Sequence, residues 1–154
     1  MTVFVKASDI GAEITTRLQT LRLASGAETD IGINVMRGKR KLPADDEVPC
    51  CILIEGDDSV EDAAGRLQSA LVKVRVAFII DAFDRCDPDN PNDKAHAMIR
   101  DIKRVLFVDG RTFGGKVVEV AYRGRDIGPR PDGVALVQAR VMIEVSYAED
   151  LANP

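Results

Sequence analysis

The segment Val134–Tyr147 alternates apolar with polar side chains, and no other feature of the sequence constrains the fold as strongly. Its odd-numbered positions are apolar, whereas its even-numbered positions include Gln138, Arg140 and Glu144. A period of two sends these two sets to opposite faces of a β-strand. The segment is therefore predicted to be a long strand with one buried face, in a sheet that helices cover on that side.

Four other segments have the composition of β-strands. Leu71–Phe83 carries apolar residues at its even-numbered positions, and Val117–Tyr122 is rich in β-branched residues. Ile31–Met36 and Cys50–Glu55 are expected to form shorter strands. The turn-forming residues Gly56-Asp57-Asp58 are expected to close the last of these strands.

Two segments show the spacing of amphipathic helices. The first spans about residues 8–24, with Ser8 or Asp9 able to cap it. The second spans residues 91–107, with Asn90 as its cap and a proline in its first turn. Its apolar stripe is expected to pack on the sheet. Its charged residues are expected to face water: Lys94, Arg100, Asp101, Lys103 and Arg104.

These elements predict an α+β fold with two layers. We expect a mostly antiparallel or mixed sheet of about five strands, with two main helices packed on one face. The segment Ser59–Ser69 fits a short helix through its alanines, although an ordered loop fits it as well. At 154 residues, with no internal repeat or long linker, the chain is expected to form one domain spanning residues 1–154.

The charge and hydropathy of the chain argue against several classes of partner. A net charge of −4 disfavours binding through broad phosphate neutralisation. The longest apolar run, Val76–Ile80, is too short to cross a bilayer, so no membrane partner is expected. The N-terminus lacks the features of a secretory signal, and we expect a cytoplasmic protein. Its three cysteines, Cys50, Cys51 and Cys86, are expected to be reduced.

One glycine-rich segment resembles a nucleotide-binding motif. Gly110–Lys116 matches the first seven positions of a phosphate-binding loop, in which backbone amides cradle phosphates. Val117 follows, however, where that motif needs a Ser or Thr for magnesium. The segment also runs from a helix into a strand, so no helix N-terminus is aimed at an anion. A nucleotide site is therefore disfavoured here.

The other candidate chemical groups also have structural explanations. Four acids could suggest a calcium loop, namely Asp84, Asp87, Asp89 and Asp93. Pro91 interrupts the alternating oxygen ligands that such a loop needs. Turn formation and helix capping account for these acids. His96 is the only histidine, which leaves a zinc site without partners, and no serine has a nucleophile-elbow pattern. We expect no catalytic residue, metal or cofactor.

Opposite charges follow each other closely in the stretch between the two short strands. A basic cluster comes first, and acidic residues follow after Pro43. Solvation of a loop explains such charges by default, and the acidic block offsets the basic one against nucleic acid. Blocks of opposite sign also suit a subunit interface, where each can face its complement. The basic cluster consists of Arg37, Lys39, Arg40 and Lys41, and the acidic block includes Asp45 and Asp46.

The order and spacing of the elements resemble the tail terminator, or tail completion, proteins of long-tailed bacteriophages. An N-terminal helix leads to a short strand, a long charged excursion and the proline-led strand Pro49–Gly56. An Asp/Pro/Asn turn then precedes the Ala-rich helix Lys94–Leu106, and a Gly-rich turn leads to Val117–Tyr122. The closing strand, Val141–Tyr147, precedes a short tail. The resemblance covers nearly the whole chain.

The resemblance implies a virion structural protein without catalytic residues. It implies a ring, hexameric in the family, that caps the tail tube, stops its polymerisation and meets the head-tail connector. DNA would pass through the ring without being recognised by sequence. Such a protein is assembled in the cytoplasm of the bacterial host and resides in the neck of the virion. Another neck component is an alternative, and a small ligand- or nucleotide-binding domain using Gly110–Lys116 is a rival from a different class.

We predict that two charged segments contribute to the contacts of this ring. These are the excursion over residues 37–47 and the loop over residues 84–93. An edge strand of the open sheet is a further natural contributor, since its backbone groups lack partners. The residues predicted at this interface are Arg37, Lys39, Arg40, Lys41, Asp45, Asp46, Asp84, Asp87 and Asp89.

Overall fold

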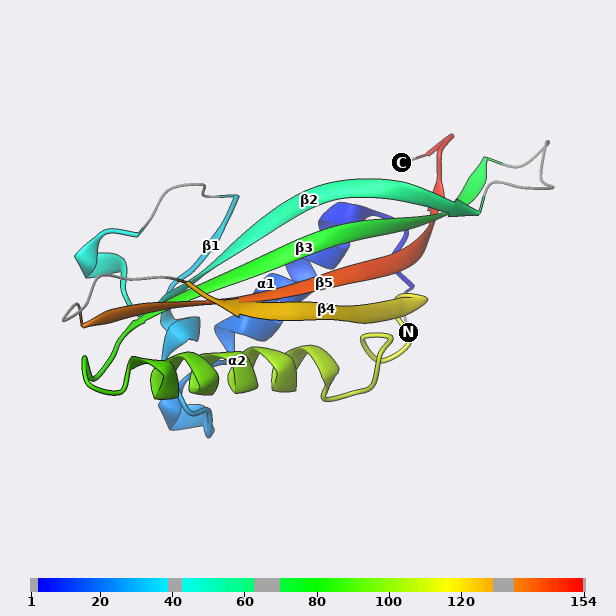
Figure 1. Ribbon diagram of the computed structural model, residues 1–154. Coiled ribbons are helices and arrows are strands. Elements are labelled where there is room, and N and C mark those ends of the chain that lie inside the picture. Colours follow the sequence, from blue (N-terminus) through cyan, green and yellow to red (C-terminus); the bar gives the residue numbers. More distant parts are fainter. Residues whose placement is uncertain (1–2, 39–42, 63–69, 129–134, 154) are drawn as a thin grey trace.

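The computed structural model describes residues 3–38, 43–62, 70–128 and 135–153 (Figure 1). It shows a five-stranded mixed sheet and two α-helices, which confirms the predicted α+β fold. The helices are α1 (Ala7–Gln19) and α2 (Pro91–Phe107). The strands are β1 (Val35–Arg37), β2 (Cys50–Asp62), β3 (Leu71–Arg85), β4 (Glu119–Ile127) and β5 (Leu136–Asp150).

The strands are arranged in the order β1-β2-β3-β5-β4. β1 runs parallel to β2, and the other neighbouring pairs are antiparallel. β3 and β5 pair over their whole length, from Leu71 opposite Asp150 to Arg85 opposite Leu136. They therefore form the centre of the sheet, with β2 and β4 on either side (Figure 1).

Both helices lie on the same face of the sheet, and the main core lies between the two layers (Figure 1). α2 packs mainly on β5, whereas α1 contacts β1, β2 and α2. The alternation predicted for the two central strands is confirmed, since Val74, Phe78, Val141 and Val145 are buried in this core. The core also receives Ile10, Ile14 and Leu18 from α1, and Met98, Ile102 and Leu106 from α2.

The N-terminal part differs from the prediction at three places. α1 ends at Gln19, earlier than predicted, because the following segment crosses the end of the helix and the Gly32 amide donates to the Leu21 carbonyl at 2.8 Å. The strand predicted over Ile31–Met36 is reduced to β1, and Ile31–Ile33 instead forms a 3₁₀ turn. The first helix also has no side-chain cap, since Lys6 occupies that position.

Strand β2 is longer than predicted. Gly56-Asp57-Asp58 does not end the strand but forms a bulge between Glu55 and Asp58, after which pairing with β3 resumes. Residues 59–62 are therefore in a strand, so neither the short helix nor the ordered loop expected from Ser59 is correct there. The rest of that segment, residues 63–69, lies outside the described part of the chain. The long partner β3 supplies the pairing that overrides the local turn signal.

The two C-terminal strands are also shifted relative to the prediction. β4 begins at Glu119, later than the predicted Val117, and continues to Ile127, beyond the predicted end at Tyr122. A bulge between Tyr122 and Gly124 allows this continuation, and Gly124 adopts a positive φ of 123°. β5 continues to Asp150, beyond the predicted end at Tyr147, because its partner β3 begins as early as Leu71.

Asp101 of α2 was predicted to face water and is instead fully buried. Its carboxylate accepts hydrogen bonds from the Thr29 hydroxyl at 2.6 Å and from the Glu28 amide at 3.0 Å. Arg104, one turn later, donates to it at 3.3 Å. Asp101 therefore fastens the segment before β1 to the middle of α2, since a buried carboxylate requires such donors.

Candidate functional site

The predicted acidic segments come together at one end of the sheet. Arg85, the last residue of β3, donates to the carbonyl of Asp45 at 3.0 Å and to that of Val48 at 3.3 Å. Asp45 and Asp46 belong to a short 3₁₀ turn and are exposed. Asp84 precedes Arg85, so both predicted acidic segments share this end of the molecule.

Within the second segment, the acids mainly organise the turn into α2. The Asp87 carboxylate accepts the Asp89 amide at 3.0 Å, and Lys94 lies 3.6 Å from Asp84. Asp87 and Asp89 are exposed. Among the described residues, no group of three or more His, Cys, Asp or Glu side chains is arranged to hold a metal ion.

The predicted basic cluster is only partly described. Arg37 ends β1, and its guanidinium donates to Glu55 at 2.6 Å and to the Ser8 carbonyl at 3.2 Å. It therefore connects β1, β2 and α1 while remaining partly exposed. Lys39, Arg40 and Lys41 lie outside the described residues.

The glycine-rich segment after α2 is held by α1. The Arg17 guanidinium donates two hydrogen bonds to the Asp109 carboxylate, at 2.8 and 2.9 Å, and this bidentate ion pair lowers the pKa of Asp109. The Arg17 guanidinium also lies 4.7 Å from the centre of the Phe113 ring. Lys116, which would contact phosphates in a nucleotide-binding loop, is bound to Glu13 at 3.1 Å. The segment thus has the contacts of a structural connection.

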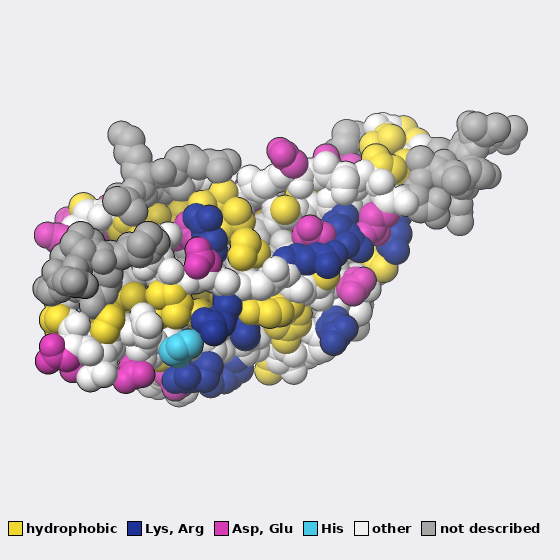
Figure 2. Space-filling model, viewed as in Figure 1, with side chains coloured by type: hydrophobic (Ala, Val, Ile, Leu, Met, Phe, Trp, Pro, Cys, Tyr) yellow, Lys and Arg dark blue, Asp and Glu magenta, His cyan; other side chains and the backbone are white. Residues whose placement is uncertain are grey.

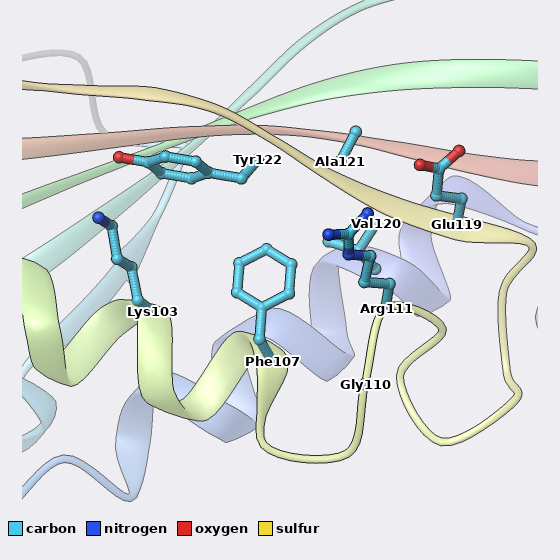
Figure 3. Close-up of a pocket in the computed structure, with 8 residues that line it drawn as sticks. All are labelled: Lys103, Phe107, Gly110, Arg111, Glu119, Val120, Ala121 and Tyr122. Atoms are coloured by element: carbon cyan, nitrogen blue, oxygen red, sulfur yellow. The ribbon is translucent and has the colours of Figure 1, made fainter.

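A hollow of about 750 Å³ lies beside this segment, between the end of α2 and the outer strand β4 (Figure 3). Tyr122 and Phe107 supply its aromatic walls. The Lys103 ammonium lies 4.5 Å from the centre of the Tyr122 ring, and Arg111 contributes a second cation from the opposite side. Glu119 adds one carboxylate, so the hollow is aromatic and carries two cations and one acid.

Strand β4 is the outer strand on this side of the sheet. The Val120 amide donates to the Arg111 carbonyl at 2.6 Å, so the preceding loop covers the first part of the edge. From Tyr122 to Ile127, β4 pairs only with β5 within the described ranges. Tyr122 is 41% exposed, and Arg125 is exposed as well. This stretch is an edge with cationic and aromatic side chains.

The opposite edge of the sheet is acidic. β1 pairs with β2 only at Cys51–Leu53, and the last part of β2, from Asp58 to Asp62, pairs with β3 alone in the part of the chain that the structure describes. Asp57 and Asp58 are exposed, and Val60 is 60% exposed. A hollow of about 720 Å³ adjoins both acids and is lined by Val76 and Phe78 on its helix side.

The face of the sheet away from the helices has a mixed character. At one end, Val48, Cys50, Ile52 and Phe83 form a small apolar cluster. Elsewhere the side chains form ion pairs, and Figure 2 shows Lys and Arg in groups between hydrophobic side chains.

Two ion-pair groups on this face join neighbouring strands. Arg140 of β5 contacts Asp81 of β3 at 2.7 and 3.0 Å, and Asp81 is only 5% exposed. In the second group, Arg75 binds both Glu61 and Glu144. Burial alone would raise the pKa of Glu61, but hydrogen bonds from Ser146 and Arg75 outweigh it and lower that pKa.

The histidine and the cysteines lie apart from these surfaces. His96 is half-buried on α2. All three cysteines are free, and the neighbours Cys50 and Cys51 point to opposite faces of the sheet, as predicted. Burial raises the pKa of the Cys51 thiol, so the thiol stays protonated and is a poor nucleophile.

The sequence predicted an interface in the charged loops with a contribution from an edge strand, but it did not show which strands form the two edges. Asp58 and Arg125 are ordinary surface residues in the sequence, and only the strand order reveals that they border opposite edges. No helix among the described residues is both long and apolar enough to span a membrane. Comparison with models of known protein families and with curated protein sequences gave no match. The function must therefore be inferred from the geometry.

Proposed function

We propose that this protein is a structural subunit that assembles with copies of itself into a ring at the head-proximal end of a phage tail tube. In that role it ends tube polymerisation and forms the surface that meets the head-tail connector. The proposal joins the resemblance in order and spacing to tail terminator proteins with the surfaces described above.

One observation carries the proposal: within the described ranges, the last part of β2 and the last part of β4 are two unlike edges of the sheet. A ring of identical subunits is built from heterologous contacts, in which each copy offers two different patches. The β4 edge carries Tyr122 and Arg125, whereas the β2 edge carries Asp57 and Asp58. Edges of the same charge would repel, but these two are complementary and lie on opposite sides of one sheet (Figure 1).

The remaining partners follow from the same role. The tail tube protein and the connector would meet the two ends of the ring. The exposed acids Asp45, Asp46, Asp87 and Asp89 gather at one end of the sheet and offer a polar surface for one of them. DNA would pass through the ring without sequence-specific contacts.

The first experiment is the molar mass in solution, measured by size exclusion with light scattering at low and moderate salt, followed by negative-stain images. A ring of about six subunits is the expected result. Since some ring proteins assemble only on a template, a monomer leads to a second assay, in which the protein is added to growing tail tubes. Tubes of unchanged length would contradict the proposal.

The rival function, a small ligand-binding domain, has its own test. The Gly110–Lys116 segment borders the hollow with two cations, which makes this the place where an anion would bind. Thermal unfolding is followed with nucleotides and with inorganic phosphate, and Arg111→Ala serves as the matched variant. Stabilisation that depends on ligand concentration and disappears in the variant would favour the rival. We expect no stabilisation, because Lys116 is engaged by Glu13.

A further inference from the structure

We infer that two copies of the chain join edge to edge, with β4 of one copy adding to the second part of β2 of the next. In this contact, Tyr122 of the copy that supplies β4 lies opposite Val60 of the copy that supplies β2. Arg125 of the first copy lies opposite Asp58 of the second. The inference rests on the proposed self-assembly and specifies its interface.

Strand directions and faces permit this addition. β2 is antiparallel to β3, β3 to β5, and β5 to β4, so β4 runs opposite to β2. A second copy placed beside the first in the same orientation therefore brings its β4 antiparallel to β2. Its helices then remain on the same side of the continued sheet, because residues directly opposite each other in such a pair share a face.

The neighbours of the two strands limit the contact in a consistent way. On β4, the contact begins at Tyr122, because the Arg111 carbonyl already takes the amide of Val120. On β2, the pairing with β1 ends at Leu53, whose carbonyl accepts the Gly38 amide at 2.9 Å. An incoming β4 must therefore stop where β1 ends, and in the proposed register its last residue, Ile127, lies opposite Glu55.

The register pairs side chains of complementary chemistry on the helix side of the sheet. Val60 pairs with Val74 and Asp58 with Val76, and both of these β3 residues point into the core, so Val60 and Asp58 lie on that side. Tyr122 and Arg125 pair with the buried Ile143 and Val141 and share the same side. The contact would cover two exposed apolar side chains and form a cross-strand ion pair.

Both strands carry a bulge in the stretch that is paired, and the two bulges leave the offset between the strands unchanged. Positions can be compared along β5, by taking residues that pair across the sheet as one row. Asp58 is in the row of Val145, and Arg125 is in the row of Val141. Glu55 and Ile127, beyond the bulges, are in the rows of Ile143 and Ala139. Each pair is thus offset by the same four residues along β5, so a single register satisfies the whole stretch.

This offset has a geometric consequence that supports the inference. Four residues correspond to a stagger of about 13 Å along the strands, while one copy spans about 19 Å across its four long strands. A sheet continued in this way has strands inclined by about 35° to the ring axis, within the range seen in closed β-barrels. The stagger of this register therefore agrees with the strand tilt that a closed ring requires.

Cysteine cross-linking tests the register. One chain carries Val60→Cys and a second, distinguishable in mass, carries Tyr122→Cys, both in a Cys86→Ser background. Residues opposite each other in an antiparallel pair have Cα atoms about 4.5–5.5 Å apart, within disulfide range. On mild oxidation, we expect disulfide-linked dimers only in the mixture of the two chains. Val118→Cys is the matched control, because Val118 directly precedes β4, is 51% exposed against 41% for Tyr122, and lies outside the paired stretch; it should not cross-link with Val60→Cys.

Charge exchange provides a second measurement. Asp58→Arg and Arg125→Asp should each weaken association at least tenfold, because each sets like charges against one another in the contact. An equal mixture of the two variants should associate again, since every junction between unlike chains then pairs opposite charges. Circular dichroism of each variant shows whether the monomer remains folded.

The outcomes separate this inference from the proposed function. Rings without the mixed cross-link would overturn the register and leave the proposed function standing. Mixed cross-links in open chains, with no closed rings and no effect on tail tubes, would support the register and contradict the proposed function. Cross-linking of either single variant with itself at the rate of the mixture would show a two-fold contact and overturn the inference.

Discussion

Removal of the Asp101 carboxylate should destabilise the protein more than the loss of any other charged side chain of α2. Asp101→Ala leaves the hydroxyl of Thr29, which is 1% exposed, and the Glu28 amide without their acceptor. A buried donor left unpaired costs about 1–3 kcal/mol, so the expected loss in the free energy of unfolding is about 2–4 kcal/mol. In thermal unfolding this corresponds to a midpoint lowered by roughly 5–15 °C.

Urea unfolding followed by circular dichroism measures this loss. Glu28→Ala is the matched control, because it removes the exposed ion pairs with Arg100 and Arg104 but keeps the backbone amide that Asp101 accepts. The control should cost less than about 1 kcal/mol. Thr29→Val combined with Asp101→Ala should cost less than the sum of the two single changes. If Asp101→Ala loses no more than Glu28→Ala, the anchoring role of Asp101 is refuted.

Three further predictions concern assembly and ionisation. Replacement of Arg37, Lys39, Arg40 and Lys41 together by Glu should weaken assembly in light scattering while the monomer stays folded; unchanged assembly would remove the basic cluster from the interface. The lowered pKa of Glu61 means that its contribution to stability is present at neutral pH and is lost as the pH falls from about 4.5 through the lowered value. Urea midpoints measured between pH 3 and pH 7 should therefore vary less in Glu61→Gln, and an equal slope would contradict this. Burial raises the pKa of Tyr147 from 10.0 to about 12, so in a Tyr122→Phe variant the remaining tyrosine should ionise, by ultraviolet absorbance, only above pH 10. The contribution of Tyr147 to the free energy of unfolding should be fully present below pH 10 and should be lost between pH 10 and 12. Ionisation of Tyr147 near pH 10 in the folded protein would contradict its burial.

The parts of the fold that depend on local periodicity could be predicted from the sequence. The buried faces of β3 and β5 follow from alternation, and the bounds of α2 follow from its apolar stripe and Pro91. The second half of β2 could not be predicted, because Gly56-Asp57-Asp58 forms a turn in isolation and becomes a bulge only against β3.

The candidate surfaces were harder to predict than the fold. Whether a charged residue is a surface residue depends on partners far away in the chain, and Asp101 and its partner Thr29 are 72 positions apart. Likewise, Asp58 and Arg125 become complementary only when the strand order places β2 and β4 on opposite sides of the sheet. Periodicity in the sequence carries no information about that order.

The placement of both helices on one face determines what such an assembly could enclose. A sheet continued through six copies would contain about 24 long strands, and barrels of 16 or more strands leave a water-filled channel. The helices need the larger circumference and would form the outer wall. The inner wall would then consist of the helix-free face, where Arg75, Arg123 and Arg140 are each neutralised by Glu144 or Asp81. A polyanion moving through such a channel would meet cations already paired with acids, and it would slide rather than bind.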